Sequence, residues 1–405
     1  MSPLVLAAHR TSPHRSRVAG WRAYGRALRP RPEVTVKFRV ERDVLADSVA
    51  WAARTLPSRP SLPILAGLLL EADGDGIVVS SFDYETSSRV VVAADVAESG
   101  RALVPGRLLA DITRALPAAP VNLALDGSRV AVTCGKSVFA LPTFPVEDYP
   151  SLPAMPESSG TVPGAEFAAA VAQVAIAAGR DDTLPTLTGI RVEVEASTIT
   201  LAATDRYRLA VRELARDPAL PGIESHALVP ARILADTAKA LAGVDVVQLS
   251  LAVSSEGLMG FEGEGRRTTT RLLDGEFPKY RSLLPSETLS SATMSTEELT
   301  DSVKRVALVA ERNTPVRLEF TGSELILRAG AGDDAQATES LDCNFEGEAL
   351  EIAFNPQYLL DGLSALGSAT TTMNFTQPTR PAVLTGGAEA DSDYRYLLMP
   401  VRLAG

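Results

Sequence analysis

The stretch "RPSLPILAGLLLEADGDGIVVSSFDYETSSRV" at residues 59–90 returns in altered form as "DDTLPTLTGIRVEVEASTITLAATDRYRLAV" at residues 181–211. A Leu-Pro pair near the start and an aspartate near the end recur at the same offset of 122, the aspartates being Asp83 and Asp205. A weaker third copy at residues 311–330 carries Thr-Pro at the equivalent point. Self-similarity at a fixed period predicts that one structural unit is used several times, and this decides the fold.

The segments around each copy repeat as well. A helical pattern of apolar residues precedes each copy, and alternating Val, Ile and Leu runs typical of strands follow it. A second amphipathic helix then occurs in every copy. The expected helices span residues 41–56, 105–116, 164–179, 230–241, 296–311 and 355–366. The sequence therefore predicts an α+β protein of three tandem domains, each built from two helix-plus-strands halves.

The expected domain limits follow from composition. Polar, small-residue segments at residues 154–164 and 286–293 are typical of linkers. An Arg-rich segment without apolar periodicity comes first, and we expect it to be disordered, as a dispensable tail, an upstream extension of the reading frame, or a targeting or nucleic-acid-binding arm. The expected division is an extension at residues 1–35 and domains at residues 36–156, 157–288 and 289–405.

The charge of the chain is uneven. The net charge of -11 combines +6 over residues 1–36, from seven arginines and one glutamate, with -17 over residues 37–405. A strongly acidic body repels nucleic acid, so any DNA binding must depend on a local patch of arginines and lysines. No apolar run approaches the ~18 residues of a membrane-spanning helix, and no membrane association is expected.

Residues that usually perform catalysis are scarce. Only three histidines occur, His9, His14 and His226, and the two cysteines, Cys134 and Cys343, are far apart. Imidazole serves most acid–base chemistry, and closely spaced Cys or His residues mark zinc sites. The composition argues against an enzyme, and no catalytic residue, metal or cofactor is predicted. The isolated cysteines fit a reducing compartment, so a cytoplasmic location is expected.

The run "AATDRYRLAV" at residues 202–211 concentrates charged and aromatic side chains. A catalytic Asp205 would need partners, and no histidine, cysteine or second carboxylate recurs nearby in the sequence. Its counterpart Asp83 recurs while the neighbouring residues change. A recurring aspartate between two strands more often holds backbone amides than performs chemistry. We therefore predict that Asp205 is architectural, and a binding rim or a solvated strand end stays open for the rest of the run.

The second helix of each domain presents polar residues at spacings of four and then three, which places them on one face. This face carries two bases in the first and second domains and none in the third. The three sets are Arg107, Asp111 and Arg114; Arg232, Asp236 and Lys239; and Gln357, Asp361 and Ser364. The repeated bases indicate a phosphate-binding surface, although an ordinary solvated helix face explains them equally well.

Several motifs in order resemble the bacterial β sliding clamp, the processivity factor of DNA polymerase III. They include "RPSLPIL", "SFDYE", "GRLLADITRALP", "FPVEDYP", "GRDDTLPTLTGI", "AATDRYRLAVRE", "FPKYRSLLP" and "YLLMPVRL". The resemblance runs from about Lys37 to Leu403, and the wording is most similar to clamps of high-GC actinobacteria. It implies three tandem DNA-clamp domains forming half of a six-subdomain ring, closed head to tail with a second copy around duplex DNA. Such closure leaves no free sheet edge and needs no third partner.

The resemblance implies that basic residues on the inner helices hold DNA without sequence preference. Arg59 stands where the family has a DNA-contacting arginine, whereas Pro185 and Thr186 stand where some relatives have aromatic contacts, which are therefore not transferred. The expected DNA-facing residues are Arg59, Arg107, Arg114, Arg232, Lys239, Lys304 and Arg305.

The joint between subunits is implied to unite the strand "GKSVFALP" of the first domain with the end of the first helix of the third domain, near acids such as Asp334 and Glu339. Apolar anchors flanked by opposite charges give a stable, directional interface. Plain core packing is the alternative for Phe139 and Leu308. The expected interface residues are Lys136, Phe139, Leu141, Ala307 and Leu308.

A hydrophobic groove between the second and third domains is also implied. There the polymerase III alpha subunit, the clamp loader and other proteins with a motif of the form Gln-x-x-Leu-Phe would dock, with Leu, Pro and Met receiving apolar side chains and arginines bonding the peptide. The implied groove residues are Leu187, Thr204, Arg206, Tyr207, Arg208, Leu209, Pro285, Pro381, Leu397, Met399, Pro400, Val401 and Arg402. Asn313 stands where some relatives have a phenylalanine beside the groove.

Other functions stay open at this point. The chain could be a second clamp copy whose altered groove resists a clamp-binding inhibitor. A nuclease would need clustered metal-binding carboxylates, which the sequence does not display. A repeat scaffold without a DNA role would lack a basic inner face.

Overall fold

The computed structural model of the chain describes residues 36–219, 222, 224–251, 257–310, 314–330, 335–387 and 393–402. The predicted extension at residues 1–35, Asn313 and Asp334 lie outside the described residues. All six expected helices form. The first helix of each domain ends earlier than its pattern suggested, and in the first domain it stops ahead of Pro57, which cannot continue a helix.

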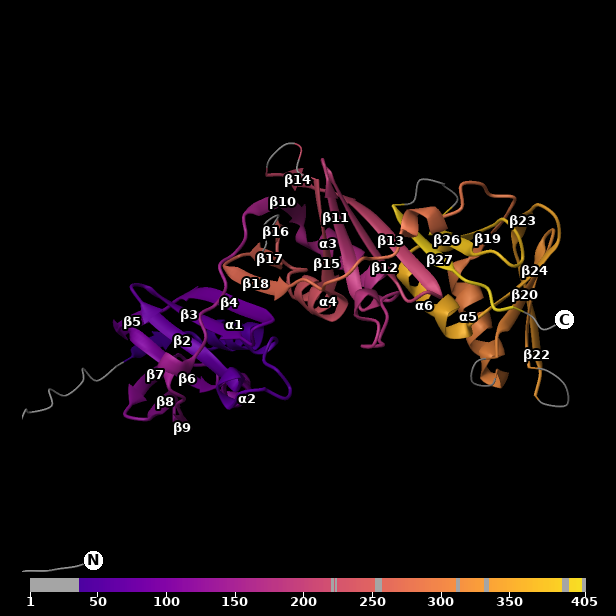
Figure 1. Cartoon of the computed structure of the whole chain (residues 1–405). Helices are drawn as coiled ribbons and strands as arrows, with labels where there is room; N and C mark the ends of the chain where they lie inside the picture. The colour runs from indigo at the N-terminus through magenta and orange to yellow at the C-terminus, as the bar shows by residue number, and fades with distance from the viewer. Residues whose placement is uncertain are drawn as a thin grey trace, which may run out of the picture. The chain divides into compact units, whose positions relative to one another are not determined.

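The three domains share one order of elements (Figure 1). The first contains β1 (Lys37–Val40), α1 (Arg42–Ala53), β2 (Gly67–Asp73), β3 (Gly76–Phe82), β4 (Thr86–Ala93), β5 (Asp95–Glu98), β6 (Gly100–Pro105), α2 (Gly106–Ala115), β7 (Val121–Asp126), β8 (Arg129–Cys134) and β9 (Ser137–Pro142). The second contains β10 (Ser158–Pro163), α3 (Gly164–Ala175), β11 (Gly189–Glu195), β12 (Thr198–Thr204), β13 (Arg208–Ala215), β14 (Asp217–Pro218), β15 (Glu224–Pro230), α4 (Ala231–Ala240), β16 (Val246–Leu251), β17 (Leu258–Gly263) and β18 (Arg266–Arg271). The third contains β19 (Ser290–Ser295), α5 (Thr296–Val306), β20 (Val316–Thr321), β21 (Glu324–Ala329), β22 (Ala337–Asp342), β23 (Asn344–Glu346), β24 (Leu350–Phe354), α6 (Pro356–Leu366), β25 (Thr370–Phe375), β26 (Ala382–Gly386) and β27 (Tyr394–Leu398).

Within the described residues the strands form four sheets, and two of these cross a domain boundary. The first domain ends in the sheet β5-β1-β7-β8-β9 and the third in β22-β21-β20-β24. Between them, β4 pairs with β18 inside one nine-stranded sheet, and β13 pairs with β27 inside the other. Both boundary pairings are antiparallel and are visible in Figure 1. Neighbouring domains are therefore joined by continuous backbone hydrogen bonding.

Paired helices cover the sheets. α1 packs on α2, α3 on α4 and α5 on α6. Each helix buries an apolar stripe, and the leucines of α2, α4 and α6 that face inward are fully buried, as the helical periodicity predicted. The polar sets of α2 and α4 stay exposed to solvent, whereas Asp361 in the set of α6 is half-buried.

The two predicted linkers are only partly irregular. We expected residues 158–163 and 290–293 to be linker residues, but they form β10 and the first part of β19, which pair with β16 and β25. The prediction was wrong for these segments because small polar residues accept a strand conformation when neighbouring strands satisfy their backbone groups.

The repeated aspartates hold matching turns. Asp83 Oδ1 accepts hydrogen bonds from the backbone N–H groups of the second and third residues after it, at 3.0 and 2.7 Å. Asp205 Oδ1 does the same at 3.0 and 3.1 Å. The residue after each aspartate is left-handed, with φ of 76° at Tyr84 and 81° at Arg206, a conformation that costs energy for a residue with a side chain. The predicted architectural role of Asp205 is confirmed.

Candidate binding sites at the domain junctions and sheet edges

The junction of the second and third domains brings the two predicted groove segments side by side. Leu209 of β13 faces Leu397 of β27 in the ladder. Just past β27, the N–H of Met399 donates to the carbonyl of Tyr207 at 2.9 Å. The run at residues 202–211 and the last strand of the chain are thus direct neighbours.

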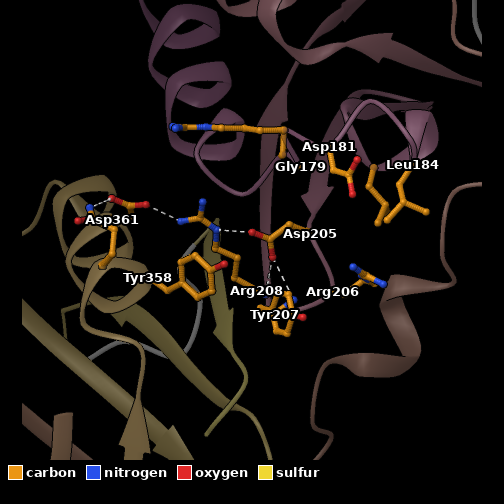
Figure 2. Close-up of a pocket in the computed structure, with 13 residues that line it drawn as sticks. Gly179, Asp181, Leu184, Asp205, Arg206, Tyr207, Arg208, Tyr358 and Asp361 are labelled. Carbon is orange, nitrogen blue, oxygen red and sulfur yellow. Dashed lines mark hydrogen bonds and ion pairs between the residues drawn. The ribbon is translucent and has the colours of Figure 1, made fainter. Parts of the chain in front are cut away.

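Arg208 is the centre of an ionic bridge across this junction. Its Nε donates to Asp205 Oδ2 at 2.9 Å, and its Nη1 donates to Asp361 Oδ2 of α6 at 2.5 Å (Figure 2). The side chain is only 6% exposed. Burial would lower the pKa of the guanidinium, but interactions with Tyr396, Asp361 and Asp205 outweigh burial and hold this pKa above its ordinary value. Arg208 is therefore committed to protein partners and positions the turn, rather than standing free for a ligand.

Aromatic rings line the same turn. Tyr207 stacks on Tyr358 of α6 with ring centroids 6.1 Å apart, and the Arg208 guanidinium lies 4.5 Å from the centre of the Tyr358 ring. Burial, followed by the charge of Asp205, raises the pKa of Tyr358. α6 can approach this closely because a Cβ at Gly362 would lie 2.4 Å from the Tyr396 ring. Tyr207 itself is largely exposed and available to a ligand.

A cavity of about 590 Å³ opens beside these groups. Four predicted groove residues line it, namely Leu187, Arg206, Tyr207 and Arg208. The sequence analysis did not predict the other residues that line this cavity. The recurrence of Asp361 in the polar sets of the second helices did point to one of them. The remaining lining residues are Ala178, Gly179, Arg180, Asp181, Leu184, Asp205, Gln357, Tyr358 and Asp361. Figure 2 shows Asp181 and Leu184 on the side opposite α6.

The other predicted groove residues lie outside this lining. Thr204, Leu209 and Leu397 are buried. The two leucines belong to a small apolar cluster that includes Phe277 and Tyr280. Pro381 and Pro400 are half-buried and Pro285 and Arg402 are exposed, while Met399 and Val401 are 40% and 37% exposed. The leucines are thus core residues of this cluster, and Met399 and Val401 are accessible apolar side chains.

The junction of the first and second domains gathers arginines around a second cavity of about 600 Å³. Four of the seven predicted DNA-facing residues line it. They are Arg59, Arg107, Arg114 and Arg232. Arg54, at the end of α1, joins them and was missed by the sequence reasoning, because it belongs to no repeated set. Asp83, Asp111 and Asp236 are the acids in the lining, so arginines are in excess.

The remaining predicted DNA-facing bases are separate from this cavity. Lys239 is exposed on α4. Lys304 pairs with Asp301 on α5 at 3.2 Å. Arg305 donates to Glu339 on β22, and the Arg305 hydrogen bond holds the pKa of that carboxyl below its usual range.

The two cavities are equivalent under the repeat. Asp83 and Thr86 line the cavity between the first and second domains. Their counterparts 122 positions later, Asp205 and Arg208, line the cavity between the second and third domains. The corresponding helix residues are Arg232, Ile233 and Asp236 of α4, and Gln357, Tyr358 and Asp361 of α6. Thr86 cannot make the ionic bridge of Arg208, so the first junction keeps its arginines exposed around an open cavity.

The predicted interface residues lie at the edge strand β9 and just after α5. β9 is the edge of one terminal sheet and β22 the edge of the other. On β9, Phe139 is 38% exposed, but Leu141 is 1% exposed and belongs to the core. Lys136 precedes β9 and is exposed. After α5, Ala307 is half-buried and Leu308 is 84% exposed, far more than isolated core packing would leave.

Within the described part of the chain, no group of three or more His, Cys, Asp or Glu side chains could hold a metal ion. Across the same residues, none of the helices has the length and apolar character needed to cross a membrane. Cys134 and Cys343 are both buried and free.

Three equivalent α+β domains, two sheet-continuous junctions and an arginine-lined cavity define a sliding-clamp type of protein. Family models for the N-terminal, central and C-terminal domains of the DNA polymerase III beta subunit match residues 36–153, 161–279 and 281–402. The chain belongs to this family, the bacterial β sliding clamps, and is of the actinobacterial type. The predicted family, the function as a sliding clamp and the three-domain fold are confirmed.

Relatives and solved structures agree with this assignment. The chain is 60% identical to the beta sliding clamp of Streptomyces coelicolor, over 91% of this chain and 100% of that protein. It is 47% identical to the beta sliding clamp homolog GriR of Streptomyces muensis, over 91% and 99%. The sliding clamp structure from Bacillus subtilis superposes with a TM-score of 0.85 at 26% identity, over 91% and 100%. A Pseudomonas aeruginosa clamp bound to griselimycin gives the same values.

Proposed function

We propose that this protein closes head to tail with a second copy into a ring that encircles duplex DNA in the cytoplasm. The ring tethers the polymerase III alpha subunit and receives the clamp loader and other proteins with a clamp-binding motif; it performs no chemistry itself. The observation that carries the proposal is the convergence of Arg59, Arg107, Arg114 and Arg232 on one cavity, in a chain whose relatives are named sliding clamps. Scattered arginines facing phosphates hold DNA without reading its sequence.

Retention on circular DNA tests this function. Once loaded on nicked circles, the protein is expected to stay bound in high salt and to leave when the circle is cut, because topology rather than affinity holds it. Replacing Arg107, Arg114 and Arg232 together by alanine should leave retention on closed circles intact. The same variant should lower the salt slope of equilibrium binding to linear duplex by roughly three, about one unit per lost phosphate contact.

Arg101→Ala serves as the matched control, because Arg101 is an exposed arginine on β6 outside the cavity. It should leave the salt slope unchanged. Salt-resistant, sequence-specific binding to linear duplex would contradict the ring. Equal retention on cut and closed circles would also contradict it.

The client groove is proposed to lie along β13 and β27, over the buried Leu209 and Leu397. Its apolar contacts are proposed to come from Met399, which is exposed and whose N–H donates to the carbonyl of Tyr207, and from Val401, which is also exposed. Methionine adapts to different side chains, which suits several clients.

Met399→Ala is expected to weaken binding of a Gln-x-x-Leu-Phe peptide about tenfold, since truncating a central apolar contact costs more than about 1 kcal/mol. Titration of a labelled peptide by fluorescence anisotropy measures the effect. Val246→Ala removes an exposed apolar side chain at the start of β16 and is the control. Unchanged affinity in Met399→Ala would count against this position of the groove.

A clamp copy with an inhibitor-resistant groove is the second candidate. The 47% identity to GriR and the griselimycin-bound clamp make it relevant. The higher identity to the Streptomyces coelicolor clamp favours the housekeeping role.

A further inference from the structure

The joint between the first and second domains repeats the joint between the second and third. β4 pairs with β18 as β13 pairs with β27. The N–H of Arg271, at the end of β18, donates to the carbonyl of Glu85 at 2.8 Å, just as the N–H of Met399, past the end of β27, donates to the carbonyl of Tyr207 at 2.9 Å. Every position at one joint therefore has a counterpart at the other.

The first joint carries an apolar cavity of about 390 Å³, distinct from the arginine-lined one. The turn after β3 separates the two, because Asp83 and Thr86 line the arginine cavity while Phe82 and Tyr84 line this one. The other lining residues are Pro153, Ala154, Leu258 and Arg271. We call this cavity the first-joint slot.

Five of its six lining residues occupy positions of the proposed client groove. The offset of 122 relates Phe82 to Thr204 and Tyr84 to Arg206. Pro153 and Pro285 both end the "FP…LP" segment of their domains. Strand register relates Arg271 to Met399, and Leu258, opposite Arg271, to Pro381. The slot is thus the groove's counterpart at the other joint.

The chemistry of the slot differs from that of the groove in two ways. The groove floor, Leu209 and Leu397, is replaced by Ser87 and Thr269, whose hydroxyls bond each other at 2.6 Å. Both side chains are buried, their hydroxyls satisfy each other, and neither lines the slot, so an apolar ligand group would pack against the lining residues. The walls are aromatic, since the Phe82 and Tyr84 rings lie 5.6 Å apart, and Tyr84 is 46% exposed.

The second difference is charge. Arg271 takes the place of Met399 and is the one charged residue in the lining of the slot. Its Nε donates to the carbonyl of Tyr84 at 2.9 Å, which holds the exposed guanidinium at the rim. No carboxylate lines the slot. A guanidinium fixed beside an apolar wall complements a carboxylate that neighbours an apolar side chain.

We propose that the first-joint slot binds an extended peptide segment of a partner protein, one that presents a leucine or phenylalanine next to a carboxylate. The inference rests on the proposed function, because it extends client docking from one joint to its repeat. Binding is weaker than in the groove, since Ser87 and Thr269 replace its two buried leucines and remove apolar surface that a ligand could approach.

The probe is the peptide acetyl-Gln-Ser-Asp-Leu-Phe-amide with a fluorine on the phenylalanine ring, titrated into the full chain and followed by 19F NMR. Two bound signals are expected, one from the groove and one from a site at least tenfold weaker. Arg271→Gln and Tyr84→Asn should each abolish the weaker signal and leave the tighter one. Asparagine is chosen because it tolerates the left-handed backbone of residue 84, so the turn is preserved.

Met399→Ala should weaken only the tighter signal. In wild type, changing the aspartate of the probe to asparagine should weaken binding at the second site, because Arg271 loses the carboxylate it would bind. A weaker signal that persists in both slot variants, or no second signal at all, overturns the slot. If the tighter signal is absent and the weaker one is retained, the proposed groove is overturned and the first-joint slot is supported.

Discussion

Replacing Asp205 by alanine is expected to lower the free energy of unfolding by about 3 kcal/mol, because it removes one partner of a buried charge pair. Asp205 supports two backbone N–H groups of its turn and the Nε of Arg208, whose side chain is 6% exposed. Without it, Asp361 is the remaining carboxylate that the guanidinium bonds among the described residues, and the left-handed Arg206 loses the turn that supports it. Urea unfolding followed by circular dichroism measures the loss.

The repeat supplies a matched control for this prediction. Asp83 makes the same two backbone hydrogen bonds but has no arginine partner, since Thr86 replaces Arg208. Asp83→Ala should therefore cost about 1 kcal/mol, the usual value for a lost capping interaction. The difference between the two variants measures the ionic bridge. Equal losses would mean that Arg208 gains nothing from Asp205.

Replacing Leu308 by aspartate is expected to convert the proposed dimer to monomers. Burying a charge in place of an apolar anchor costs about 2 kcal/mol or more at one interface between subunits. A closed head-to-tail dimer contains this interface twice, so the loss doubles to about 4 kcal/mol and weakens dimerisation roughly 1,000-fold. Leu308 is 84% exposed in the single chain, so the variant should fold normally.

Sedimentation velocity measures the dimer, and retention on nicked circular DNA reports ring closure. Phe139→Asp, on the edge strand β9, should have the same effect from the other side of the joint. Val246→Asp changes an exposed apolar residue of the second domain and should leave the dimer intact. A Leu308→Asp variant that still sediments as a dimer would place the interface elsewhere.

Repetition made much of the fold predictable. The helix periodicity, the offset of 122 and the recurring aspartates are local signals, and the structure contains the corresponding helices, domains and turns. The linkers were mispredicted because pairing with β16 and β25, which are distant in sequence, turns Ser-rich segments into strands. Local composition does not report such tertiary pairing.

The site was predictable only in part, for a similar reason. The sequence brought Arg208 into the groove as a peptide contact, whereas the fold brings Asp361 from a helix 153 residues away to neutralise it. Likewise, Leu141 alternates with exposed neighbours on β9, and only the sheet determines that its face is the core. Which groups meet across a junction depends on register between domains, and no single stretch encodes that register.

The continuous sheets have a mechanical consequence. Shearing the second and third domains apart would break a ladder that runs from Arg208 opposite Leu398 to Arg212 opposite Tyr394, and the first joint has a ladder of similar length. Because backbone hydrogen bonds continue across both boundaries, we expect the domains of one chain to move together with little bending between them. In a ring of two such chains, most of the deformation should occur at the interfaces between the two copies. In the proposed ring, we therefore expect the interface between copies, rather than any boundary within a chain, to be the place that opens.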